Sequence, residues 1–141
     1  MTTVYTDTLR AIAKGDSAEA ARHDSMIEDE ARPEFHRRVT ALFSLFLAET
    51  FEENASHDQV MRFVEEVAYG YRNIDPPVKP LALEATIRGT LGEDQLLDEI
   101  EPEEQIRVML LVIRAVAAQN ERVQLHLDKF LADADMLARE L

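Results

Sequence analysis

The chain has 141 residues, the size of one domain, and its 28 acidic and 15 basic residues give a net charge of −13. That imbalance opposes approach to phosphate backbones and anionic lipid surfaces, so we expect neither direct nucleic-acid binding nor membrane binding. Cysteine is absent, which excludes disulfides, thiolate metal sites and a cysteine nucleophile.

The first ten residues, MTTVYTDTLR, lack the basic start and apolar core of a secretory signal. No window approaches the roughly 20 apolar residues of a membrane span. We therefore expect a cytoplasmic protein. Apolar residues then recur at helical spacing up to Gly15, and glycine suits the left-handed conformation that often ends a helix. The pattern predicts a short first helix.

A second helix is predicted from Asp16, an acceptor side chain that is followed by Glu19 as in a capping box. It runs towards Glu30 and is rich in alanine but poor in large apolar residues, which is typical of a solvated surface helix. We expect residues 1–31 to form surface helices or an arm of a single helical domain that spans residues 1–141.

Two helices with broad apolar faces are predicted next. Pro33 suits the first turn of a helix, and the apolar residues from Phe35 to Phe51 mark a core face. Ser56 and Gln59 resemble a second capping box, and the apolar residues from Val60 to Tyr71 supply the buried side of the helix that follows. Both are expected to be core helices.

The segment Asp75 to Pro80 contains three prolines and is the clearest break in the chain, because proline restricts its own φ and disfavours helix at the preceding residue. Apolar spacing then predicts a short helix from Leu81 to Leu91 and one or two further turns between Leu96 and Ile100. Pro102 suits the start of a last, long helical segment.

The C-terminal segment from Glu103 to Leu141 contains neither glycine nor proline and could form one unbroken helix. Steps of three and four residues mark an apolar seam interrupted only by Asn120, and a lone polar residue in a seam can fix register or oligomer state. The seam comprises Ile106, Met109, Ile113, Val116, Asn120, Val123, Leu127, Phe130, Ala134, Leu137 and Leu141. A charged stripe, predicted to be the solvated face, comprises Arg107, Arg114, Glu121, Asp128 and Asp135.

The first half of this segment is apolar nearly all round, which favours burial between Met109 and Ala118 and a bend near Asn120. The alternative is that the second half projects and binds a partner. The fold class predicted is therefore all-α, a bundle of about five to seven helices ending in one long helix or a bent helix pair.

Sequence motifs for catalysis and metal binding are missing: Glu-x-x-His, His-Glu-x-x-His and Gly-x-Ser-x-Gly do not occur. The four glycines are too scattered for a phosphate-binding loop. Among them, Gly70 is expected either to permit close packing or to mark the end of a helix. We read His36, His57 and His126 as surface residues. The sequence therefore predicts no enzyme, no cofactor and no metal.

The favoured hypothesis is a non-enzymatic acidic helical protein–protein interaction module, an accessory or regulatory subunit that binds another protein and associates with itself. One alternative is a bundle that binds a small apolar ligand between the Phe35–Phe51 and Val60–Tyr71 helices. Another is an acidic inhibitor that mimics nucleic acid. The predicted partner interface comprises Asn120, Val123, Leu127, Phe130, Leu131, Leu137 and Leu141, since exposed apolar side chains of this kind favour association.

Overall fold

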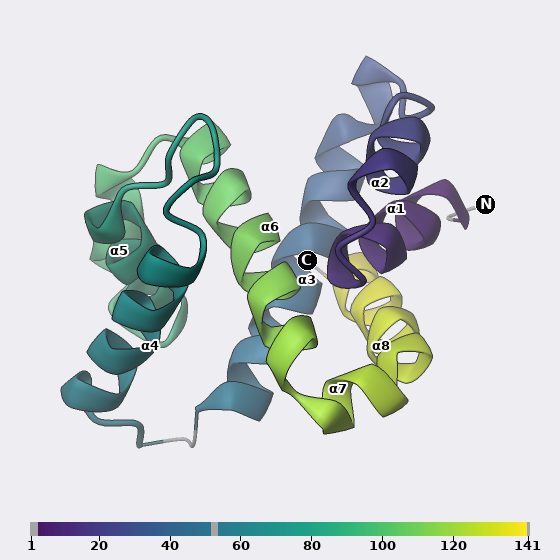
Figure 1. Ribbon diagram of the computed structural model, residues 1–141. Helices are drawn as coiled ribbons and strands as arrows, with labels where there is room; N and C mark the ends of the chain where they lie inside the picture. Colours follow the sequence, from purple (N-terminus) through teal and green to yellow (C-terminus); the bar gives the residue numbers. More distant parts are fainter. Residues whose placement is uncertain (1–2, 52–53, 141) are drawn as a thin grey trace.

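The computed structural model describes residues 3–51 and 54–140, and every regular element in these two ranges is a helix (Figure 1). The predicted all-α class is confirmed. The described residues form eight α-helices and two 3-10 helices, more than the sequence indicated. The elements are α1 (Thr3–Ala13), α2 (Ser17–Asp24), η1 (Asp29–Ala31), α3 (Arg32–Thr50), α4 (His57–Gly70), α5 (Pro80–Thr90), η2 (Asp94–Glu99), α6 (Pro102–Gln119), α7 (Glu121–Leu125) and α8 (Leu127–Arg139).

Helix α6 is the centre of the fold and lies between two groups of helices (Figure 1). On one side it packs on α1 and α3, while α8 packs on the same two helices and α2 packs on α1. On the other side it packs on α5, and α4 and η2 pack against α5 in turn. Val108, Val112 and Ile113 of α6 are fully buried. The predicted burial between Met109 and Ala118 is therefore confirmed for most of this stretch, whereas Ala118 itself is exposed.

Local sequence signals explain where several helices begin. The Asp16 carboxylate accepts a hydrogen bond from the Glu19 N–H at the start of α2. At the start of α4 both halves of a capping box are present, because the Ser56 hydroxyl accepts from the Gln59 N–H and the Gln59 side chain accepts from the Ser56 N–H. Prolines occupy the first turns of α3, α5 and α6, where a missing N–H costs no hydrogen bond.

The C-terminal segment is broken at Asn120, so the prediction of one unbroken helix is wrong and the predicted bend is confirmed. Asn120 has φ −108° and ψ 107°. Its side-chain oxygen accepts a hydrogen bond from the Val123 N–H at 3.0 Å, which caps α7. Asparagine favours such caps because its short amide competes with helical backbone hydrogen bonds. A second break at His126 separates α7 from α8.

After these breaks the chain returns to the body of the molecule, where α8 packs along α3 and touches α1. The second half of the C-terminal segment therefore does not project. Within the part of the chain that is described, no helix is both long and apolar enough to cross a membrane.

Candidate binding surfaces

Most side chains of the predicted partner interface lie in the core of their own chain. Val123, Leu127 and Leu131 are only 0%, 9% and 3% exposed. Leu137 is half-buried against the same core, and Leu141 lies outside the described residues. The structure thus covers the predicted seam with helices of the same molecule.

Phe130 differs from its neighbours because it is half-buried and also lines a surface groove. Its ring meets Phe46 of α3 edge to face, with centroids 5.5 Å apart. The groove has a volume of about 360 Å³ and is named here the α3–α8 groove. It is lined by Leu45, Ala48, Glu49, Arg122, His126, Lys129, Phe130 and Asp133.

The charged residues of the α3–α8 groove form two ion pairs that balance each other. Arg122 Nε lies 3.1 Å from a Glu49 oxygen, and Lys129 Nζ lies 2.9 Å from an Asp133 oxygen. With His126 neutral, the formal charge of the lining is zero, although the whole chain carries −13. The groove is therefore a locally neutral, partly apolar surface on a strongly acidic molecule.

Two further grooves lie beside α6, and Gly15 and Arg114 line both of them. We name the two together the α6 groove. The first part, about 280 Å³, is lined by Ala11, Ile12, Gly15, Asp16, Ser17, Ala20, Ile74, Val78, Arg107, Leu110, Leu111 and Arg114. The second part, about 490 Å³, is lined by Ala13, Lys14, Gly15, Tyr71, Arg114, Ala117, Ala118, Gln124 and Leu127.

Arg114 lies between the turn that joins α1 to α2 and the end of α4. Gly15, at φ 72°, forms this turn, and a Cβ placed on it would lie 3.6 Å from Arg114 Nε. On the other side, the guanidinium carbon lies 5.4 Å from the centre of the Tyr71 ring, a cation–π distance. Among the described residues, no carboxylate lies within ion-pair distance of Arg114 and no acceptor takes a hydrogen bond from it.

Arg107, one heptad earlier on α6, is held differently. One guanidinium nitrogen pairs with a Glu104 oxygen at 3.0 Å, and the other donates to the Pro76 carbonyl of the connector between α4 and α5. This interaction fixes the connector against α6. Both arginines are half-buried, so the expectation that they lie on a fully solvated stripe is wrong.

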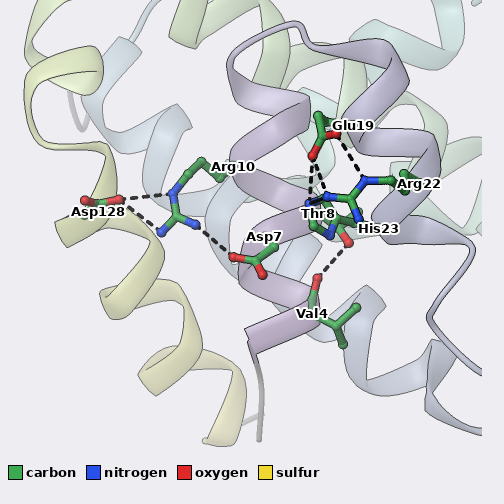
Figure 2. Close-up of polar contacts among 8 residues, drawn as sticks. All are labelled: Val4, Asp7, Thr8, Arg10, Glu19, Arg22, His23 and Asp128. Atoms are coloured by element: carbon green, nitrogen blue, oxygen red, sulfur yellow. Dashed lines mark hydrogen bonds and ion pairs between the residues drawn. The ribbon is translucent and has the colours of Figure 1, made fainter.

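One polar contact joins α1 to α8, and others lie within α1 and within α2 (Figure 2). Arg10 of α1 pairs with Asp7 at 3.0 Å and with Asp128 of α8 at 3.1 Å. On α2, Glu19 pairs with Arg22 at 2.8 Å and with His23 at 3.2 Å. The hydrogen bond from Arg22 lowers the pKa of the Glu19 carboxyl.

The phenylalanine and histidine side chains considered in the sequence differ in how far they are buried. Phe35, Phe43 and Phe46 of α3 are buried, and α3 packs on α6 and α8 while α4 packs on α5. His57 and His126 are exposed. His36 is half-buried, contrary to expectation, and burial lowers its pKa. Among residues 3–51 and 54–140, no cluster of three or more His, Asp or Glu side chains is arranged to hold a metal ion.

Comparison of the chain with protein-family models, with curated proteins and with solved structures gave no match. Function is therefore inferred from the geometry of the two grooves.

Proposed function

We propose that this chain is a non-enzymatic helical protein–protein interaction module, an accessory or regulatory subunit that associates with itself through the α3–α8 groove. The observation that supports this proposal is the local neutrality of the groove on a chain of net charge −13. Two such chains repel each other on average, so their contact is least costly where local charge is balanced.

The ion pairs of the groove also suit a two-fold contact. In a symmetric dimer the same patch faces itself, so each cation of one copy can approach a carboxylate of the other. Arg122 with Glu49, and Lys129 with Asp133, supply both signs on each copy. Phe130, Leu45 and Ala48 supply apolar surface to bury, and Leu125 of α7 is 80% exposed. Removing such side chains from water favours association.

The described lining of the groove favours binding over catalysis. Among the side chains that line the groove, His126 carries the one imidazole, and none carries a hydroxyl. Nucleophilic catalysis needs a nucleophile within hydrogen-bond reach of such a base. A binding role uses only the apolar surface and the paired charges that are present.

Sedimentation equilibrium of the wild type, Ala48→Glu and Ala21→Glu tests self-association. Ala48 is exposed and lines the groove, whereas Ala21 is exposed on α2 and does not. We expect a concentration-dependent dimer, weakened about tenfold or more by Ala48→Glu and unchanged by Ala21→Glu, since an unpaired charge at an interface costs several kcal/mol. A wild-type chain that stays monomeric at millimolar concentration contradicts self-association.

The accessory role is tested with the same variants. We expect the wild type to capture a partner from the source cell, and a partner that all three proteins capture equally binds outside the α3–α8 groove, which self-association covers. Failure of the wild type to capture any partner contradicts the accessory role.

A further inference from the structure

We propose that the α6 groove binds a small organic carboxylate with an apolar chain or ring, and that Arg114 holds the carboxylate. This site is separate from the proposed self-association surface, because the α6 groove and the α3–α8 groove share no lining residue.

Arg114 has no carboxylate partner among the described residues, unlike most other arginines of the chain. Nine other arginines pair with a carboxylate within the described residues. Arg114 does not, although it is half-buried and the chain is rich in acidic residues. A guanidinium partly removed from water gains from a charged acceptor, and its planar fork matches a carboxylate through two parallel hydrogen bonds.

Contacts on two sides confine the Arg114 side chain before any ligand binds. Its guanidinium lies between the Gly15 backbone and the Tyr71 ring. Gly15 permits the tight turn at this point, because its φ of 72° is unfavourable for residues that carry a Cβ. A side chain confined in this way loses less conformational entropy when it binds, so more of the interaction energy appears as affinity.

Basic residues outnumber acidic ones in the lining of the α6 groove. The two parts of the groove are lined by three basic residues, Lys14, Arg107 and Arg114, and by one acidic residue, Asp16. The Asp16 carboxylate caps α2. Arg107 is already paired with Glu104, so Lys14 and Arg114 against Asp16 leave the lining with a small positive charge, which favours an anion on an otherwise acidic molecule.

The volume and the apolar lining of the α6 groove limit the size and polarity of a ligand. The first part of the groove, about 280 Å³, is near the lower limit of about 300 Å³ for small-molecule sites. Ile12, Ile74, Val78 and Leu110 line it beside Arg114. An apolar chain placed there removes these side chains from water, whereas a purely polar anion such as phosphate would leave them exposed to water. A short-chain carboxylate fits both requirements.

The test is an NMR titration of the full chain with octanoate, octylammonium and 1-octanol as matched probes. We expect octanoate to shift the amide signals of Gly15, Tyr71 and Arg114 in a saturable way, and to bind about tenfold or more tightly than the cationic or neutral probe, since one charge-assisted pair is worth about 1.4 kcal/mol or more. Equal binding of the three probes, or no octanoate shifts in the groove at millimolar concentration, overturns the proposal.

Variants assign the role of Arg114. Arg114→Gln is expected to weaken octanoate binding about tenfold or more, whereas Arg62→Gln, an equal charge change at an exposed residue outside the groove, leaves it unchanged. Val78→Asp places a carboxylate in the groove from the connector and is expected to weaken binding even if Arg114→Gln disturbs the fold. Undiminished octanoate binding in Arg114→Gln or in Val78→Asp contradicts the assignment. Neither outcome bears on self-association, which uses other residues.

Discussion

Arg38 is a charged side chain placed in the core, at 6% exposure. Its Nε donates to Asp135 of α8 at 2.9 Å, and its Nη1 donates to the Glu34 carbonyl and carboxylate. Its guanidinium also lies 4.9 Å from the centre of the Tyr5 ring. One residue thus joins α3 to α8 and to α1. The neighbouring Arg37 is exposed. Helical spacing places Arg38 on the same face as the buried apolar residues of α3, but its partner Asp135 is 97 positions away along the chain, so the sequence alone does not predict the pair.

Asp135→Ala should lower the free energy of unfolding by about 2 kcal/mol, because it leaves a buried guanidinium without one of its acceptors. The matched control, measured at a concentration low enough to keep the chain monomeric, is Asp133→Ala, whose carboxylate pairs with Lys129, a side chain that is 73% exposed. That change should cost less than about 0.5 kcal/mol. Urea unfolding measures both, and equal losses would contradict a structural role for the Arg38–Asp135 pair.

At the scale of elements, two helical glycines have opposite surroundings. Gly70 is the last residue of α4, and a Cβ added to it would meet nothing within 4 Å. It therefore marks a helix end and does not permit close packing. Gly89 of α5 is the position of close approach, since a Cβ there would lie 2.6 Å from Leu97 Cγ of η2.

Gly89→Ala should therefore destabilise the protein by about 1–2 kcal/mol, because overpacking exceeds the gain in helix propensity. Gly70→Ala should stabilise it by about 0.5–1 kcal/mol, since alanine is the better helix residue and has space. Thermal unfolding of the two variants checks the opposite signs. A stabilised Gly89→Ala would mean that η2 moves away from α5 at little cost.

The sequence predicts those features of the elements that depend on neighbours along the chain. The caps at Asp16 and Ser56 form as expected because each is a contact across three residues. Asn120 interrupts the apolar seam, and the sequence indicates either a residue that fixes register or a bend at this point; the choice depends on whether α8 returns to α3. Arg114 falls by its spacing on the stripe that is predicted to be solvated. The sequence feature that could have indicated its partial burial is that Arg114 is the only charged residue between Val108 and Ala118.

At the scale of the whole molecule, the two groups of helices around α6 are attached unequally (Figure 1). Helix α3 packs on both α6 and α8, while α4 packs mainly on α5. In α4 only the three valines Val60, Val64 and Val67 are fully buried within the described residues. Regions with few buried apolar contacts open locally at lower free energy than the core.

Hydrogen exchange should therefore be faster in α4 than in α3 and α6 under native conditions. Mass spectrometry of peptic peptides measures this difference directly. A destabilised variant such as Asp135→Ala should speed exchange in α3 and α8 more than in α4, because its lost contact joins those two helices. Equal protection of α4 and α3 would show that the molecule opens as one cooperative unit.

The position of α6 along the chain sets the order in which folding can finish during synthesis. Helices α1, α3 and α5 emerge from the ribosome first, yet each packs on α6. Until residues 102–119 have been made, the apolar faces of these helices lack the surface that covers them in the native state, and exposed faces of this kind are prone to aggregate. The nascent chain can therefore complete its fold only after α6, and then α8, have been made.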